Sequence, residues 1–183
     1  MIPILVVVGI IVLLLIVVVS VYNGLVQKRM RCQEGWSQID VQLKRRYDLI
    51  PNLVETVKGY AGHEKSTLEA VINARSRAMG ASGVKDQAEA ENMLSGALRQ
   101  LFALQESYPN LKANENFSSL QEELTGTENK IAFSRQHYND TVSIYNTSCQ
   151  TFPNNMIAGM FGFKEREFFQ GEEAVKQAPK VSF

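Results

Sequence analysis

The chain has 183 residues, 19 basic (Lys, Arg) and 19 acidic (Asp, Glu), and 45% of its residues are hydrophobic. This composition excludes a disordered chain, a collagen-like chain and a disulfide scaffold, and the zero net charge argues against nucleic-acid binding. The averages combine two unlike parts. Residues 1–26 carry no charge and include 21 hydrophobic residues, whereas the remaining 157 residues carry every charge. We therefore expect one domain of ordinary size attached to a membrane.

The apolar segment, Ile2 to Val26, predicts a single transmembrane helix within an anchor at residues 1–27. Its 25 residues would span ~37 Å as a helix, against a hydrocarbon core of ~30 Å. It is too long for the apolar part of a secretory signal, and it lacks the basic start and the cleavage site of one. A basic flank, Lys28, Arg29 and Arg31, follows at once. Basic flanks favour the cytoplasmic side, so we expect the C-terminal domain in the cytoplasm and these side chains within reach of anionic lipid.

Apolar or aromatic residues then recur every 3.6 residues on average, which predicts a helix with one apolar face. They are Trp36, Ile39, Leu43, Tyr47, Ile50, Val54, Val57 and Ala61. Pro51 lies inside this helix, where it either kinks the helix or ends it and starts another. Because the apolar spacing continues across Pro51, we favour the kink. Asn23-Gly24 is the one weak point between the anchor and this helix, so the sequence leaves open whether the two are continuous.

Three further helical patterns follow. The first runs from Leu68 to the turn at residues 80–83, and the second has regularly spaced apolar positions from Ala90 to Tyr108 and stops at Pro109. The third runs from Phe117 to Phe152, 36 residues, and stops at Pro153. Short connections make sequential helices antiparallel neighbours, and no strand pattern appears. The predicted fold is therefore all-α, an elongated antiparallel helical bundle over residues 28–153 that follows the N-terminal transmembrane helix.

Hydroxyl residues alternate with apolar residues on the inner face of the long helix. This polar seam consists of Thr127, Ser134, Thr141 and Ser148. An unsatisfied buried hydroxyl costs about 1–3 kcal/mol. We therefore expect the seam either to form hydrogen bonds across the bundle or to fix the register of helix pairing.

The Phe/Met segment, Phe152 to Phe169, is unusually rich in large apolar residues. It contains Phe152, Met156, Ile157, Met160, Phe161, Phe163, Phe168 and Phe169, with a short helix expected over residues 154–169. Three interpretations stay open: a lid on the end of the bundle, a contact between subunits, and a segment in the membrane interface. Residues 170–183 are predicted to form a polar, flexible tail.

Catalytic and metal-binding motifs are not found in the sequence. His63 and His137 lie 74 residues apart, and no metalloprotease, nucleotide-binding or nucleophile-elbow motif occurs. Cys32 and Cys149 form no CxxC pair, which suits a reducing compartment and helical packing positions. We expect a non-catalytic protein without a metal or cofactor.

The charged residues of the bundle predict contacts between helices. Arg46 shares the apolar face with Ile39 and Leu53, so we expect it to be partly buried and paired. Glu128 and Arg135 lie seven residues apart beside the polar seam, where they are either charged contacts to another helix or a solvated edge. We favour the contacts, because buried arginines require neutralisation.

Several stretches together resemble the LemA family of bacterial membrane proteins. They include Tyr22 to Val26, the eighteen residues from Trp36 to Leu53, Val57 to Tyr60, Tyr108 to Ala113, Thr127 to Ile131, Tyr138-Asn139, Tyr145-Asn146 and Phe152-Pro153. Gly35 stands where the family usually has alanine. From the charge pattern and this resemblance we predict a structural and charge network. It consists of Trp36, Asp40, Arg45, Arg46, Asp48, Pro51, Asn52, Glu128, Arg135, Tyr138 and Asn139.

The resemblance implies a single N-terminal anchor in the bacterial inner membrane, a short outer N-terminus and a helical cytoplasmic bundle without an assigned enzyme activity. One branch of the family is linked to magnetosome formation, and members are often encoded near TPM-domain membrane proteins or membrane metallopeptidases. The first hypothesis is a self-assembling scaffold that organises membrane proteins or the bilayer. The alternative is an adaptor or regulator of a membrane protease or TPM-domain protein. A third, a hydrolase or transferase, requires a histidine beside a carboxylate in a pocket.

Overall fold

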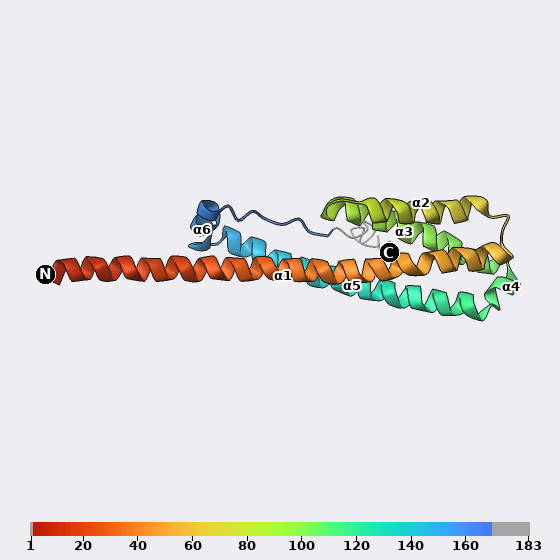
Figure 1. The fold of residues 1–183 in the computed structure, drawn as a ribbon, viewed down its shortest axis with the longest axis horizontal. Coiled ribbons are helices and arrows are strands. Elements are labelled where there is room, and N and C mark those ends of the chain that lie inside the picture. Colours follow the sequence, from red (N-terminus) through yellow and green to blue (C-terminus); the bar gives the residue numbers. More distant parts are fainter. Residues whose placement is uncertain (1, 170–183) are drawn as a thin grey trace, which may run out of the picture. The chain divides into compact units, whose positions relative to one another are not determined.

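The computed structural model describes residues 2–169, and within that range every regular element is a helix (Figure 1). The α-helices are α1 (Ile2–Tyr60), α2 (Lys65–Gly80), α3 (Val84–Ala103), α4 (Pro109–Lys112), α5 (Glu115–Gln150) and α6 (Asn154–Phe161), and η1 (Leu104–Glu106) is a short 3-10 helix. The predicted all-α class is confirmed. The tail predicted over residues 170–183 lies outside the described residues.

Helix α1 continues without interruption for 59 residues. The apolar segment and the helix predicted from Trp36 onward therefore belong to one helix. Pro51 lies inside it, so the alternative in which Pro51 ends one helix and starts another is wrong. The most apolar part of α1 has a mean hydropathy of 3.6 and none of it is buried. By length and composition α1 is able to cross a membrane, which suggests a single-pass membrane anchor.

The remaining helix ends follow local sequence signals. A turn at residues 81–83 separates α2 from α3, and Gly83 has φ 87°, a backbone conformation that favours glycine. The prediction that the next helix continues to Tyr108 is wrong, because α3 ends at Ala103. Pro109 instead opens α4, where a first-turn residue needs no backbone donor. Helix α5 has the predicted 36 residues but begins and ends two residues earlier.

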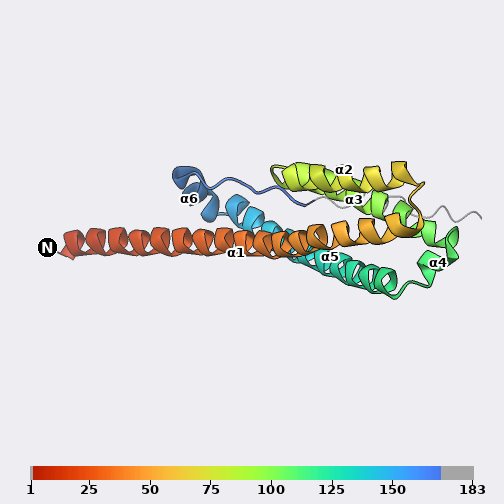
Figure 2. The ribbon, with the colours of Figure 1, turned by 45° about the vertical axis from the view of Figure 1, so that its right-hand side comes forward.

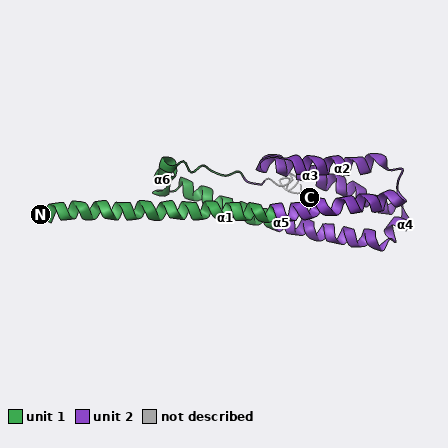
Figure 3. Cartoon of the chain, in the orientation of Figure 1, with its two compact units in different colours: residues 1–39, 134–167 green, residues 40–133, 168–183 purple. Residues whose placement is uncertain are grey.

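The described residues form two compact units, shown in different colours in Figure 3. Unit 1 combines residues 2–39 of α1 with residues 134–167, which include the end of α5 and all of α6. Unit 2 contains residues 40–133 together with residues 168–169. Within unit 2, α2 and α3 lie side by side in both views of the ribbon (Figures 1 and 2).

Each unit has its own apolar core. In unit 2, buried side chains from all the long helices include Leu43, Leu53, Val57, Val71, Leu94, Leu101, Phe117 and Ile131. In unit 1, they include Leu25, Cys32, Ile39, Tyr138, Val142, Tyr145, Ile157 and Ala158. The predicted inward faces of α1 and α5 are therefore confirmed, except that Phe152 is 79% exposed. Since burial of apolar surface drives helix packing, these faces account for the pairing of α1 with α5 in both units.

Candidate functional site

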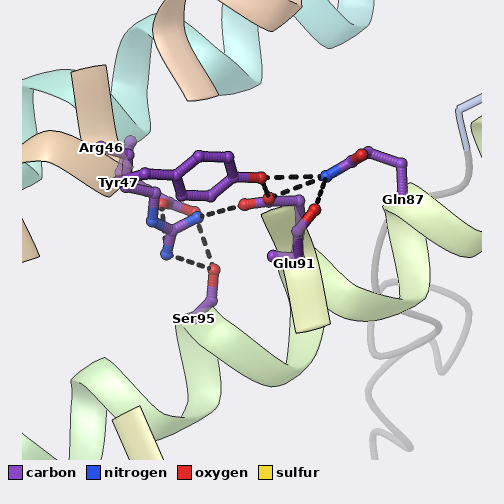
Figure 4. Close-up of polar contacts among 7 residues, drawn as sticks. Arg46, Tyr47, Gln87, Glu91 and Ser95 are labelled. Atoms are coloured by element: carbon purple, nitrogen blue, oxygen red, sulfur yellow. Dashed lines mark hydrogen bonds and ion pairs between the residues drawn. The ribbon is translucent and has the colours of Figure 1, made fainter. Parts of the chain in front are cut away.

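A buried polar network lies in the core of unit 2, where α1, α3 and α5 meet (Figure 4). Its centre is Arg46 on α1, whose side chain is only 3% exposed. One guanidinium nitrogen, Nη1, lies 3.1 Å from Glu91 Oε2 on α3, and the other, Nη2, lies 3.0 Å from Glu128 Oε2 on α5. Nη2 also donates to Ser95 Oγ at 2.8 Å. One arginine thus joins three helices through charge-assisted contacts.

Glu91 is the fully buried acceptor of this Arg46 network. Its side chain is 0% exposed, and its second oxygen, Oε1, accepts a hydrogen bond from the Tyr47 hydroxyl. Gln87 Nε2 donates to the same oxygen at 3.1 Å and to the Ala78 carbonyl at 3.1 Å. Burial, and then the hydrogen bond to Glu91, raises the pKa of Tyr47 well above its usual range. Tyr47 therefore stays a neutral donor at any physiological pH.

The network agrees with part of the sequence prediction. Arg46 is buried and paired as predicted, and Glu128 is its partner rather than a solvated edge residue. Glu91, Gln87 and Ser95 were not predicted. The available signal was the spacing of α3, in which Gln87 and Glu91 precede Leu94 on the buried face in steps of four and three residues.

The other network residues predicted in unit 2 lie on its surface. Asp40, Asp48, Pro51 and Asn52 are exposed. Arg45 lies 3.7 Å from Glu123, with side chains 50% and 47% exposed. An exposed pair of this kind contributes little, about 0–1 kcal/mol. The contacts of Arg46 are therefore shorter and more buried than the Arg45 pair.

In unit 1 the predicted aromatic residues hold α1 against α5. The rings of Trp36 and Tyr138 meet edge to face with centroids 5.6 Å apart. A Cβ atom added to Gly35 would lie 3.3 Å from the Tyr138 Cα atom, so the two backbones approach closely here. Arg135 and Asn139 are half-buried on the same stretch of α5. Gly35, Trp36 and Tyr138 thus lie at the contact between α1 and α5 in unit 1.

The polar seam of α5 faces inward as predicted, and three of its four hydroxyls donate to carbonyls of their own helix. The Thr127 hydroxyl donates to the Glu123 carbonyl, and the Ser148 hydroxyl donates to the Ile144 carbonyl. The Thr141 hydroxyl similarly donates to a carbonyl of its own helix. Local hydrogen bonds of this type satisfy buried hydroxyls without a second helix.

The basic flank lies beside a groove between the side chains of α1 and α5 in unit 1. The groove has a volume of about 430 Å³ and is lined by Lys28, Arg31, Glu34, His137, Asp140, Thr141 and Ile144. Arg29 points elsewhere, and its guanidinium carbon lies 5.2 Å from the centre of the Phe163 ring. Such a cation–π contact is worth about 0.5–1 kcal/mol at an exposed site.

The helix predicted over residues 154–169 is shorter in the structure, because α6 ends at Phe161 and Gly162 has φ 70°. The Phe/Met segment falls into three parts. Ile157 is buried on α6, whereas Met156, Met160 and Phe161 are exposed on the same helix. Phe152, before α6, is exposed, and Phe163, after it, is half-buried. Phe168 is 45% exposed and Phe169 is buried. The segment is thus not one continuous surface, and its exposed apolar groups concentrate on and beside α6.

The LemA family matches residues 35–183, most of the chain. The chain belongs to the LemA family. Relatives include magnetosome proteins MamQ 1 and MamQ 2 of Paramagnetospirillum magneticum, each 27% identical over 179 residues, covering 84% of this chain and 66% of the relative. Protein LemA of Metamycoplasma hominis is 26% identical over 156 residues, covering 82% and 69%. The chain therefore spans just under two thirds of the length of the two MamQ relatives.

The two histidines of this LemA-family chain lie on the surface, and its two cysteines lie in unit 1. His63 and His137 are both exposed. Cys32 is buried in α1 and Cys149 is half-buried in α5, and neither is in a disulfide. Burial raises the pKa of both thiols, which keeps them protonated and poorly nucleophilic. Among residues 2–169, no group of three or more His, Cys, Asp or Glu side chains could hold a metal ion.

Proposed function

We propose that this LemA-family chain is a non-catalytic, membrane-anchored scaffold that self-associates and so organises membrane proteins or the bilayer. The observation that carries the proposal is α1, in which one uninterrupted helix contains both the apolar segment and the first helix of the bundle. Because α1 is continuous, the proposed membrane span and the first helix of the bundle are parts of the same helix. The Arg46 network supports the proposal, since it ties three helices of unit 2 into a defined arrangement.

The proposed location is the bacterial inner membrane, with a single span and the two helical units in the cytoplasm. The basic flank supports this orientation, because Lys28, Arg29 and Arg31 follow the apolar segment within five residues. The orientation is tested by replacing the exposed residue Met93 with cysteine, Met93→Cys, and treating spheroplasts with a membrane-impermeant maleimide. Labelling only after the cells are opened is expected, and labelling of intact spheroplasts would refute the orientation.

Self-association is supported by large apolar side chains on the surface of unit 2. Phe133 on α5 is 73% exposed and Val41 on α1 is 63% exposed. Exposed aromatic and aliphatic groups are typical anchors of protein contacts. The names of the MamQ relatives point the same way, because they refer to a cellular structure, the magnetosome, and not to a reaction.

Sizing of the full-length protein in detergent by light scattering tests the scaffold. We expect a defined oligomer for the wild-type chain and a smaller species for Val41→Ser/Phe133→Ser. A matched control, Thr125→Ala on the exposed side of α5, leaves the size unchanged. Monomeric behaviour of the wild-type chain at all concentrations would refute self-association.

Crosslinking in native membranes tests the proposed role against the adaptor hypothesis. Crosslinks between copies of this chain are expected to dominate. Dominant crosslinks to a membrane peptidase or a TPM-domain membrane protein would replace the scaffold by an adaptor or regulator of that partner.

A further inference from the structure

Helix α6 packs with one side on the end of the apolar segment. Its buried residues Ile157 and Ala158 form a cluster with Leu25 of α1, and Val18 and Val21 pack against that cluster. The ribbon views agree that α6 lies beside α1 (Figures 1 and 2). The α1 residues in this cluster lie one to eight positions before Val26, the last residue of the apolar segment. The helix therefore sits beside the span itself, and not only beside the bundle.

The other side of α6 is apolar and exposed. Met156, Met160 and Phe161 are 59%, 76% and 53% exposed, and Phe152 just before the helix is 79% exposed. No Asp, Glu, Lys or Arg occurs between Asp140 and Lys164. Soluble surfaces rarely leave so many large apolar side chains together without a charge among them.

The exposed side of α6 is continuous with the exposed side of the apolar segment. The rings of Phe161 and Tyr22 meet with centroids 4.9 Å apart, and Tyr22 and Phe163 meet at 5.6 Å. Tyr22 belongs to the apolar segment. Val19, three residues before it in the same segment, is 56% exposed. The surface that α6 adds is thus an extension of the surface that the span presents to lipid.

The depth of α6 matches the membrane interface. At ~1.5 Å per residue, the contacts from Val18 to Leu25 lie roughly 2–12 Å along the helix from Val26. Interfacial helices bury their apolar face about 5–10 Å into the boundary between headgroups and acyl chains. Basic groups lie just beyond α6, because Arg29 lies 5.2 Å from the centre of the Phe163 ring and Lys164 is the next residue in sequence.

Hydrogen bonds fix α6 in this position. The extended residues 163–167 return along α5, where the buried residue Asn146 both donates to the Arg166 carbonyl and accepts from the Arg166 backbone N–H, each at 2.9 Å. The Tyr145 hydroxyl donates to the Lys164 carbonyl at 3.0 Å, and the Tyr138 hydroxyl donates to the Glu167 carbonyl at 3.0 Å. The segment that follows α6 is therefore tied to α5, which holds the helix at the level of the span.

We propose that α6 is an interfacial membrane helix that inserts Met156, Met160 and Phe161 into the leaflet beside the basic flank. The inference rests on the proposed membrane anchoring by α1. The occupant of the exposed face is the lipid bilayer, because that face continues the lipid-facing surface of the span and lies within its last eight residues. Of the three interpretations of the Phe/Met segment, the structure favours the interfacial one for α6.

Tryptophan fluorescence of the full-length chain in phosphatidylcholine vesicles tests the proposal. Trp36 is the single native tryptophan, so Trp36→Phe gives a dark background that keeps a ring against Tyr138. Two variants are made in this background, Met160→Trp on α6 and Met93→Trp on α3. Met93→Trp is a matched control, because Met93 is also exposed, at 50%. A third variant, Leu14→Trp, reports whether the span is inserted. Each is measured with and without lipids brominated on the acyl chains, near the headgroup for positions 160 and 93 and near the bilayer centre for position 14.

Bromolipid should quench Met160→Trp and Leu14→Trp severalfold more than Met93→Trp. Quenching at position 14 with none at position 160 would overturn the inference while leaving the anchor intact. Absence of quenching at both positions would overturn the anchoring and the inference together. A blue-shifted position 160 that bromolipid does not quench, and whose shift grows with protein-to-lipid ratio, would identify a second copy as the occupant and also overturn it.

Discussion

Removal of Arg46 should destabilise unit 2 far more than removal of its neighbour Arg45. In Arg46→Met, Glu128 loses its partner but is 42% exposed and regains water. Glu91 is 0% exposed and cannot regain contact with water, although it keeps its hydrogen-bond donors Tyr47 and Gln87. The variant therefore leaves one buried carboxylate without a countercharge. Breaking a buried pair in this way costs about 3–5 kcal/mol.

The matched control is Arg45→Met, on the same helix and with the same side-chain change. Its partner Glu123 lies at 3.7 Å and both groups are about half exposed, so the expected cost is about 0–1 kcal/mol. Urea denaturation of the full-length chain in detergent, followed by far-ultraviolet circular dichroism, measures both free energies of unfolding. Equal losses for the two variants would refute the reasoning.

A double variant separates the pair from its surroundings. Arg46→Met/Glu91→Leu removes both buried charges and fills the space with apolar groups. Because neither charge is then left alone, it should cost less than the sum of the two single variants, with a coupling of roughly 0.5–3 kcal/mol. Strict additivity would mean that Arg46 acts through Ser95 and Glu128, and not through Glu91.

Three further outcomes follow from the packing of α1 and α5. Gly126 of α5 faces open space, so Gly126→Ala should raise the free energy of unfolding by about 0.5–1 kcal/mol. A Cβ atom at Gly35 would lie 3.3 Å from a Cα atom of α5, so Gly35→Leu should lower that free energy by about 1–3 kcal/mol. Urea denaturation measures both changes. Burial raises the pKa of Tyr145 from its ordinary value of 10 to about 12. Its contribution to stability is therefore complete below about pH 10 and is lost as the pH rises toward 12, and Tyr145→Phe should flatten the alkaline unfolding curve over that range; an unchanged slope would contradict this. In the native chain, iodoacetamide should modify the half-buried Cys149 before the fully buried Cys32, as read by mass spectrometry, and the reverse order would be inconsistent with the packing of unit 1.

The fold was predictable wherever one helix face carries the information. The apolar spacing of α1 and α5 predicts which residues are buried, because a helix must place that face against a neighbour. The end of α3 was not predictable in this way. A regular apolar spacing continues to Tyr108, yet Pro109 begins a short helix, and the choice between stopping and starting at a proline depends on the packing around it.

The Arg46 network shows what local spacing leaves out. The sequence indicates that Arg46 is buried, because it shares a face with Ile39 and Leu53, but it does not indicate which acid neutralises it. Glu91 lies 45 positions away in the sequence, on α3. A charged residue at that position also suggests that the apolar face of the helix is interrupted there. Partner identity depends on the register between helices, which no single helix encodes.

The position of α6 depends on the same long-range information and has a larger consequence. Composition alone left the Phe/Met segment as a lid, a subunit contact or a membrane segment. What separates these is that α5 returns antiparallel to α1, which delivers Ile157 and Ala158 to Leu25 and thus to the end of the span. If α1 spans the bilayer as proposed, the contact of α6 with Leu25 brings α6 to the membrane surface. An uncharged, exposed helix at that point has lipid as its nearest apolar neighbour, so the chain would hold one leaflet at two places, through α1 and through α6.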